Sequence, residues 1–480
     1  MVDVLLVKPP LSAEMLYGEL SGVGAYDAPL GIAYLAASLR EKGISVELLD
    51  GGSSGLSFDQ LVDLIVDKEP KYLGLSAVTL EIQSAAELAL QVKEKVPEIK
   101  TIIGGVHLTA IPSNTMEKFL QFDLGVLGEG EITLVELIKA LEDNSDYRSV
   151  PGIVYRDDGR VLTSPPRMPN RNLDALPLPA WDLLPGFPER YSSAAYAAST
   201  TPSCSILTSR GCGHQCTFCF QGSMGRLLRF HKAEYVLNLI KYLYNKYGIK
   251  DFRILDDQFL ANKNRTVEIC NLLINENLGI TFSCLARINT INPEILQLLK
   301  QAGCRQLSFG IESGSQRILE LIKKGIKLED VEQAVKWTKQ AGIKTLGYFM
   351  MGFPTETEQT LQETMDFSCR LLLDDISFFF LTPFPGTEIH RDVQCFGAFN
   401  EDWSNMSLFT DPSFIPESLT KEKLIACRKK VLLRFYMKPR IIWAYLRQLN
   451  SPARIKGFLV GLLAMAKLVL SRGGNKNSQG

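Results

Sequence analysis

The stretch Cys212-Gly-His-Gln-Cys216-Thr-Phe-Cys219 places three thiols at positions i, i+4 and i+7 of one short loop. Thiolates bind soft metals and iron–sulfur clusters, and this spacing allows three irons of a four-iron cluster to be bound while the fourth stays open. Zinc would need a fourth ligand, and zinc sites more often pair two Cys-x2-Cys units, whereas no second unit is present. We therefore predict an iron–sulfur cluster on Cys212, Cys216 and Cys219, with His214 as an ordinary loop residue.

The chain around this loop alternates between strand and helix patterns from residue 201 to about residue 400. Helical periodicity at 233–247, 293–302 and 328–341 separates several of the strands. Repeated strand–helix units predict parallel strands, and six of them predict an incomplete (β/α)6 barrel whose site lies at the carboxyl ends of the strands. The strand candidates are 205–208, 252–255, 281–285, 306–309, 345–350 and 376–381.

Residues 1–145 show the same alternation, which predicts an α/β domain built on a doubly wound parallel sheet. Ligands of such sheets bind outside the carboxyl ends of the strands. The strand candidates are 2–7, 46–49, 72–75, 101–103 and 124–127, and the helix candidates are 29–42, 58–67, 81–96 and 133–141.

Proline-rich residues 146–200 are predicted to be a linker, opened by a short hairpin at 152–162. Residues 401–480 are predicted to form a basic helical cap. The whole chain has a formal net charge of −1, whereas residues 421–480 contain 14 Lys or Arg and one Glu, a net charge of +13. This asymmetry indicates a contact with an anionic lipid or partner.

The sequence begins without the pattern of a signal peptide, and its longest apolar run, 457–470, is interrupted by Lys467 and too short to span a bilayer. Ten cysteines without an export signal indicate reduced thiols, so we expect a cytoplasmic protein. The basic C-terminal segment fits either a cap over a substrate pocket or a peripheral contact with the inner face of the membrane, and both interpretations stay open.

Cys-x3-Cys-x-aromatic-Cys after a first barrel strand resembles the loop of the radical S-adenosylmethionine (SAM) superfamily, and the ends of the later strands agree with that family in order. The resemblance implies that Phe218 packs on the adenine of SAM. It also implies that Asp256 and Asp257 help to hold the methionine amino group. The other SAM contacts that it implies are Arg287, Glu312, Ser313, Gly352 and Pro383.

The N-terminal sheet carries a second resemblance. Ser76-Ala-Val78 follows the third strand and Gly104-Gly105 the fourth, which is similar to the Ser-x-Leu and Gly-Gly signature of cobalamin-binding domains, with Val78 in place of Leu. In that family these small residues line a slot for the nucleotide tail of cobalamin. A dinucleotide fold would instead show Gly-x-Gly-x-x-Gly after the first strand, which the sequence lacks.

The resemblance also implies that Gly128 and Glu129 form the rim of the same slot. The Asp-x-His-x-x-Gly motif that supplies a cobalt ligand in many of these domains is missing after the first strand, as is common in cobalamin-dependent radical SAM proteins. His107 is the only histidine of this domain, and we expect it to contact the tail or its phosphate rather than cobalt.

A cobalamin-type sheet followed by a linker and a cysteine-loop barrel resembles the cobalamin-dependent radical SAM enzymes. The resemblance implies an oxygen-sensitive enzyme with a 4Fe-4S cluster, SAM and cobalamin, which methylates an unactivated carbon through a 5′-deoxyadenosyl radical and methylcobalamin. Ring formation of the anaerobic magnesium-protoporphyrin ester cyclase type stays open, as does a radical SAM enzyme with a vestigial cobalamin domain. A non-catalytic sensor would leave the SAM segments without a role.

The partners that we expect follow from the same resemblance. They are a small-molecule or lipid-like substrate and a reductant such as flavodoxin or ferredoxin. The near-neutral total charge gives no sign of a nucleic-acid partner.

Overall fold

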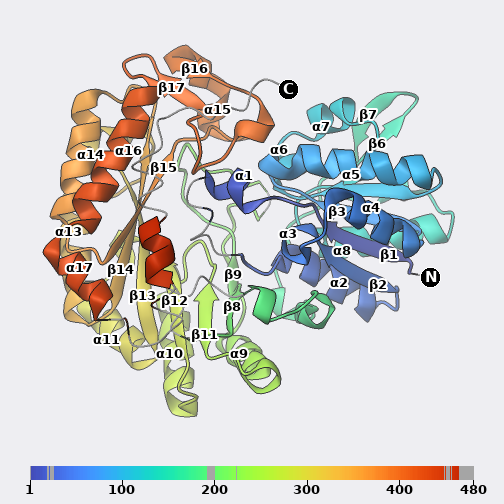
Figure 1. The fold of residues 1–480 in the computed structure, drawn as a ribbon. Coiled ribbons are helices and arrows are strands. Elements are labelled where there is room, and N and C mark those ends of the chain that lie inside the picture. The colour runs from blue at the N-terminus through green and yellow to red at the C-terminus, as the bar shows by residue number, and fades with distance from the viewer. Residues whose placement is uncertain are drawn as a thin grey trace.

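The computed structural model describes residues 2–447 except 19–20, 22–25, 192–199 and 223, together with residues 449, 455 and 457–463. Two α/β units lie side by side, the N-terminal one in blue and cyan and the second in green to orange (Figure 1). Both contain the parallel sheets that the alternating pattern predicts, so the α/β fold class is confirmed.

The N-terminal unit is a seven-stranded sheet in the order β2-β1-β3-β4-β5-β6-β7. The first five strands along the chain are parallel, whereas β6 and β7 are antiparallel additions at one edge. The strands are β1 (Val4–Lys8), β2 (Val46–Asp50), β3 (Tyr72–Ser76), β4 (Lys100–Gly104), β5 (Leu124–Val126), β6 (Ile153–Asp157) and β7 (Arg160–Thr163).

Alternate residues of β1 supply two separate cores because successive side chains of a strand point to opposite faces. Val4 and Leu6 belong to the core that also contains α2 and α8, whereas Leu5 and Val7 pack in the core of α4 and α5. The helices are α2 (Leu30–Glu41), α3 (Gly51–Ser54), α4 (Phe58–Asp67), α5 (Ile82–Lys95), α6 (Val106–Ala110), α7 (Pro112–Lys118) and α8 (Gly130–Glu142).

The expected end of this unit at residue 145 is too early. The hairpin of β6 and β7 does not open the linker but continues the sheet, because buried Ile153 and Val154 cover the edge of β5. The following linker is also packed rather than loose. Trp181 is fully buried, and the Ala180 N–H donates a hydrogen bond of 3.0 Å to the Ala33 carbonyl in α2.

The second unit is a six-stranded, all-parallel half barrel in the order β15-β14-β13-β12-β11-β8. All six predicted strands are present within two residues of their expected starts. The strands are β8 (Ser203–Ile206), β11 (Asp251–Ile254), β12 (Thr281–Ala286), β13 (Cys304–Glu312), β14 (Lys344–Met351) and β15 (Asp375–Phe380). The helices are α9 (Ala233–Tyr247), α10 (Lys263–Glu276), α11 (Pro293–Gln301), α12 (Gln316–Leu321), α13 (Leu328–Gln340) and α14 (Glu358–Arg370).

The C-terminal part is not purely helical, as the sequence pattern had suggested, because β16 and β17 form a small antiparallel sheet that begins before residue 401. It also reaches back across the molecule, since the Ser407 hydroxyl donates a hydrogen bond of 2.8 Å to the Leu16 carbonyl in α1 (Ala13–Tyr17). In the described part of the chain, no helix has the length and apolar character needed to cross a membrane. The elements are α15 (Glu388–Asp392), β16 (Gly397–Phe399), β17 (Phe414–Pro416), α16 (Lys421–Tyr436) and α17 (Pro439–Leu446).

Candidate active site

The cysteine loop is closed at its base by two short strands, β9 (Ser209–Arg210) and β10 (Arg229–Phe230), which pair antiparallel. Gly211 begins the loop with φ of +89°, and a Cβ there would lie 2.4 Å from the Leu227 carbonyl oxygen, so only glycine fits. The loop therefore presents its cysteines from a fixed base at the carboxyl-terminal side of β8.

The three free thiols of this loop are the candidate ligands of an iron–sulfur cluster. The Cys219 side chain is exposed at the edge of the loop, but desolvation by the atoms around it and the nearby Cys216 thiol raise the pKa of Cys219 to about 12, while the Lys324 ammonium opposes that shift. Among the described residues, no three His, Cys, Asp or Glu side chains converge on a single metal ion. A polynuclear cluster does not need such convergence because each thiolate binds a different iron.

Two neighbours of this loop were not singled out from the sequence. The Gln258 amide donates a hydrogen bond of 3.2 Å to the Cys212 sulfur. Lys324 is buried and its ammonium lies 5.8 Å from the centre of the Phe218 ring. The Lys-Lys-Gly segment that contains Lys324 matches no motif, and only the fold brings it to the cysteine loop.

Asp256 does not have the role that the resemblance implies. Its carboxylate is fully buried and accepts hydrogen bonds of 2.6 to 3.0 Å from the backbone N–H and the hydroxyl of both Thr208 and Ser209. All four donors belong to the segment that leads into the cysteine loop, so Asp256 anchors the loop to β11. Asp257 has an exposed side chain, so its contact with SAM stays a prediction.

Replacing Asp256 with alanine is expected to lower the free energy of unfolding by roughly 3 kcal/mol, because the N–H groups of Thr208 and Ser209 would be left buried without an acceptor. Asp257→Ala is the matched control and should change it by less than about 0.5 kcal/mol. Urea denaturation of the two variants measures the difference. Equal costs would contradict the anchoring role.

Three of the expected SAM residues meet around Lys324. Glu312 has φ of +68°, a conformation that non-glycine residues rarely adopt, and its carboxylate pairs with the Lys324 ammonium at 2.6 Å. The Arg287 guanidinium donates a hydrogen bond to the Lys324 carbonyl. With Phe218 beside the same ammonium, the structure places Glu312, Arg287 and Phe218 at one edge of the cysteine loop.

Ser313 does not have the contact with SAM that the resemblance implies. Its side chain is fully buried, and its hydroxyl lies 3.0 Å from the Thr364 hydroxyl in α14. It also accepts a hydrogen bond from the Ser315 N–H, so it shapes the turn after β13 rather than facing a ligand.

Gly352 lies in a tight turn after β14, with φ of +93°. The buried Glu356 carboxylate accepts hydrogen bonds from the Gly352 and Phe353 N–H groups at 2.5 and 3.2 Å, and burial raises the pKa of Glu356 to about 7. The Phe353 ring centre lies 6.1 Å from that of Phe218. Pro383 is buried just past the end of β15.

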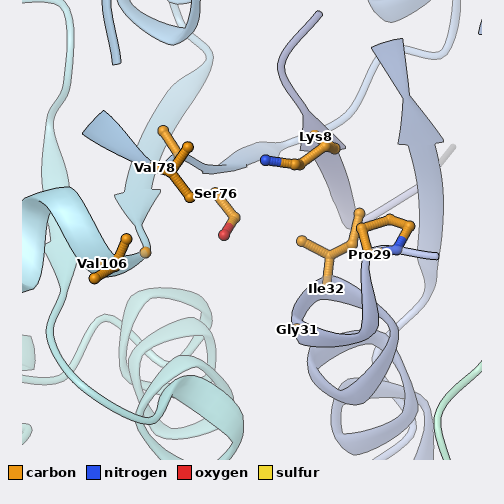
Figure 2. A pocket seen from close by; sticks show the side chains of 9 residues that line it. Lys8, Pro29, Gly31, Ile32, Ser76, Val78 and Val106 are labelled. Carbon is orange, nitrogen blue, oxygen red and sulfur yellow. The ribbon is translucent and has the colours of Figure 1, made fainter. Parts of the chain in front are cut away.

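A cavity of about 190 Å³ opens at the carboxyl ends of β1, β3 and β4 (Figure 2). Three of the residues expected to line a cobalamin slot, Ser76, Val78 and Gly105, do line it. Its other lining residues are Lys8, Pro29, Gly31, Ile32, Ala77 and Val106.

Two loops that border the cavity are in direct backbone contact. Gly105 has φ of +104°, and a Cβ there would lie 2.5 Å from the Ala77 carbonyl oxygen, so the two loops touch backbone to backbone. The Lys8 side chain points into the cavity (Figure 2) and pairs with the buried Glu81 carboxylate, which also accepts a hydrogen bond of 3.0 Å from the Val78 N–H. Lys8 gives this mainly apolar slot a cationic group, and no sequence motif had pointed to it.

Gly104 and His107 do not line this cavity. The His107 side chain is fully buried under Trp403, at 4.5 Å between ring centres, and its Nδ1 lies 3.2 Å from the Thr79 hydroxyl. Burial lowers the pKa of His107 to about 4. The expected contact of His107 with the cobalamin tail is therefore wrong, because the ring is used to pack the C-terminal segment on the N-terminal unit.

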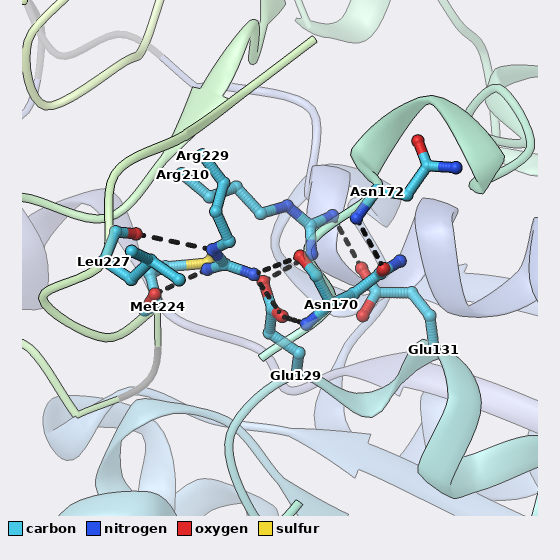
Figure 3. Close-up of polar contacts among 8 residues, drawn as sticks. All are labelled: Glu129, Glu131, Asn170, Asn172, Arg210, Met224, Leu227 and Arg229. Carbon is cyan, nitrogen blue, oxygen red and sulfur yellow. Dashed lines mark hydrogen bonds and ion pairs between the residues drawn. The ribbon is translucent and has the colours of Figure 1, made fainter. Parts of the chain in front are cut away.

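Gly128 and Glu129 do not line it either, but face a smaller cavity of about 60 Å³ beside the linker. Glu129 is shared between the Arg210 and Arg229 guanidinium groups (Figure 3). Burial acts to raise the pKa of Glu129, but its hydrogen bonds with the two arginines and their charges hold it below the ordinary value. Glu129 therefore does not form the rim of the expected cobalamin slot, because its carboxylate is bound by the two arginines.

Comparison with known protein families divides the chain into the same two units that the structure shows. The B12 binding domain family matches residues 22–138, and the radical SAM superfamily matches residues 206–368. The sequence is 33% identical over 443 residues to an uncharacterized methyltransferase of Pyrococcus horikoshii, and the alignment covers 92% of this chain and 94% of that protein. It is 27% identical over 417 residues to the anaerobic magnesium-protoporphyrin IX monomethyl ester cyclase of Rubrivivax gelatinosus, covering 85% of this chain and 74% of the cyclase.

A solved structure has a closely similar fold. It is the cobalamin-dependent S-adenosylmethionine radical enzyme OxsB with aqua-cobalamin and S-adenosylmethionine bound, which superposes with a TM-score of 0.76 at 19% identity. The superposition covers 98% of this chain and 72% of that chain, so it extends over both α/β units.

Proposed function

The chain belongs to the radical SAM enzymes that carry a B12-binding domain, and from that membership we propose that it methylates an unactivated carbon of a small-molecule substrate. The observation that carries the proposal is one chain that combines three unpaired loop thiols with a small-residue slot in the preceding domain. The cofactors of such an enzyme are a 4Fe-4S cluster, SAM and cobalamin.

When bound, these groups supply a carbon-centred radical derived from SAM and a methyl group carried by cobalamin. The protein's own part is to hold and orient them and to exclude water. Cys212, Cys216 and Cys219 would hold the cluster, and the aromatic face of Phe218 would orient SAM together with Glu312. Because Lys324 neutralises Glu312, the pair adds no net charge where SAM would bind.

Methylation is preferred to ring closure because the methyltransferase relative is more similar and is covered almost completely, whereas the cyclase is less similar and longer. Ring closure remains the second candidate, supported by that 27% identity over most of the chain. We assign the electron to a small reductant such as flavodoxin or ferredoxin, and place the enzyme in the reducing cytoplasm, where its ten cysteines stay thiols.

Anaerobic reconstitution with iron, sulfide and hydroxocobalamin tests the proposal, followed by SAM and dithionite. We expect about four irons and one corrinoid per chain, and 5′-deoxyadenosine as a product. Iron and nucleoside without corrinoid would overturn the methyl-transfer function and leave a radical SAM enzyme with a vestigial cobalamin domain. Corrinoid and cluster without nucleoside would instead indicate a non-catalytic sensor.

A second proposal concerns the C-terminal apolar face, which we infer contacts an anionic bilayer. Ile442, Trp443 and Leu446 lie on the outer side of α17, while Ile441 is buried beneath them. The residues of the C-terminal apolar face are Met437, Ile442, Trp443, Leu446, Leu459, Leu462 and Leu463, all exposed.

The charge of this region fits anionic lipid, because residues 421–480 carry 14 basic side chains and one acid. Tyr445 and Phe458 lie 6.4 Å apart between ring centres, which brings the helical residues 457–463 next to α17. An exposed apolar strip within a basic segment is the pattern of helices that lie in the membrane interface. Such a contact would bring the enzyme to a lipid-like substrate.

We expect the double variant Trp443→Ser/Leu446→Ser to bind phosphatidylglycerol vesicles roughly tenfold more weakly, because it removes apolar area that would enter the interface. Co-sedimentation measures the change. Leu120→Ser is the matched control, since Leu120 is 74% exposed and lies between α7 and β5 of the N-terminal unit. Equal binding to phosphatidylcholine vesicles, or no effect of the double variant, would contradict the proposal.

A further inference from the structure

The two ends of the cysteine loop carry a pair of buried arginines. Arg210 and Arg229 lie directly opposite each other in the β9–β10 ladder that closes the loop. Arg229 also donates hydrogen bonds to two carbonyls inside the loop, those of Met224 at 2.6 Å and Leu227 at 3.4 Å (Figure 3). The two guanidinium groups are therefore part of the loop's own architecture.

Both arginines reach across to the N-terminal unit. Glu129 accepts from Arg210 at 2.9 Å and from Arg229 at 2.7 Å, one on each carboxylate oxygen, and Glu131 pairs with Arg210 at 2.6 Å. Glu129 also accepts a hydrogen bond of 3.1 Å from the Asn170 N–H of the linker. One carboxylate thus joins the cysteine loop, the linker and the N-terminal unit.

A hydrogen-bonded path continues from Glu129 to the N-terminal cavity. The backbone N–H of Gly128, the preceding residue, donates to the Thr109 hydroxyl at 3.0 Å. That hydroxyl donates in turn to the Gly105 carbonyl at 2.9 Å, and Gly105 lines the cavity. The path from the wall of the cavity to the base of the cysteine loop therefore consists of hydrogen bonds and ion pairs of 2.7 to 3.0 Å and the peptide bond between Gly128 and Glu129.

The energetics favour a positioning role over a purely stabilising one. Two acids and two arginines balance in charge, and the side chains of all four are at most 10% exposed. Buried ion networks contribute little to net stability relative to packed apolar groups, yet losing one partner leaves an uncompensated charge. Such a network tolerates few arrangements, so it fixes the geometry between the groups that it joins.

We propose that Glu129 is the positioning residue that couples the cobalamin slot to the SAM-binding cluster loop, so that each ligand changes the affinity for the other. The inference rests on the proposed function, because it needs both ligands. The two sites are joined by a continuous network of hydrogen bonds and ion pairs, which is the kind of network that carries energetic coupling between sites. Coupling of binding is reciprocal, so the two affinities must change by one common factor.

The test measures four dissociation constants on the anaerobically reconstituted enzyme: SAM with and without hydroxocobalamin, and hydroxocobalamin with and without SAM. In the unchanged enzyme we expect each ligand to change the dissociation constant of the other by the same factor, about fivefold or more. Glu129→Gln removes the charge shared by the arginines and should bring the factor close to one, while each ligand alone still binds. The electron paramagnetic resonance spectrum of the reduced cluster with SAM should then no longer respond to cobalamin.

Two further variants keep the test decisive. Thr109→Val removes the hydroxyl between Gly105 and Gly128 without touching a buried charge, and should also abolish the factor even if Glu129→Gln fails to fold. Glu136→Gln is the matched control on α8, because it breaks only the exposed pair with Arg167 and should leave the factor unchanged.

The outcomes separate the inference from the function. Both ligands binding with a factor of one in the unchanged enzyme would overturn the coupling and leave the proposed function intact. A factor that survives in both Glu129→Gln and Thr109→Val would overturn the role of this path. Failure of either ligand to bind the unchanged enzyme would overturn the proposed function, and the inference with it.

Discussion

Replacing Cys212, Cys216 and Cys219 together with alanine is expected to reduce the iron content after reconstitution from about four irons per chain to near zero. The charge-transfer absorbance of the iron thiolates and the formation of 5′-deoxyadenosine should disappear with it. The physical reason is that each of these thiolates would bind a different iron, so the triple variant removes every protein ligand that this loop offers to the cluster.

The matched control is Cys395→Ala, which removes an exposed thiol outside the loop and should retain full iron content. Circular dichroism should show that the triple variant keeps its fold, because Cys216 is the only one of the three whose side chain is buried. Retained cluster in the triple variant would refute the ligand assignment.

Filling the N-terminal cavity from Gly31 is expected to weaken binding of hydroxocobalamin by at least about tenfold, a loss of ~1.4 kcal/mol. Gly31 lines the cavity from α2, and a Cβ there would meet no atom within 4 Å. Because Gly31 lines the cavity and a Cβ there is unobstructed, a leucine can occupy space that the ligand needs without a clash in the folded protein. Replacing a helical glycine also favours the helix, so stability should not fall.

Equilibrium dialysis with hydroxocobalamin measures the effect of Gly31→Leu. Gly31→Ala is the graded control, since one methyl group occupies little of the 190 Å³ cavity and should change the affinity only slightly. Iron content and SAM binding without cobalamin should be unchanged in both variants. Wild-type affinity in Gly31→Leu would show that cobalamin binds elsewhere.

The elements of the fold follow closely from local patterns. The helices at Phe58–Asp67 and Ala233–Tyr247 have the bounds that the sequence predicts. The first begins at a capping box of Ser57 and Gln60, and the second ends at Gly248 in a left-handed conformation. These signals act within a few residues, so they are readable without the tertiary structure.

The roles of single side chains follow less well, because they depend on donors that are distant in the chain. Asp256 is 48 residues from Thr208, and Glu129 is 100 residues from Arg229. A motif predicts that a carboxylate lies at the end of a strand. It does not show whether that carboxylate is already bound by a hydroxyl or guanidinium group from elsewhere in the chain. Lys8 and Lys324 were missed for the same reason, since neither belongs to a motif.

The sequence by itself determined the α/β class and the half barrel, because strand periodicity is a local property, and its cysteine spacing predicted the cluster ligands for the same reason. The cobalamin-binding character of the first sheet followed from its resemblance to a known family. The tertiary structure decided which residues are free to meet a ligand. In the folded protein, internal contacts occupy the side chains of Asp256, Ser313, His107 and Glu129. Folding also places Lys8 at the N-terminal cavity and Lys324 at the cysteine loop. Burial and pairing are properties of the packed chain, and they set the charge and the access on which the chemistry of a site depends.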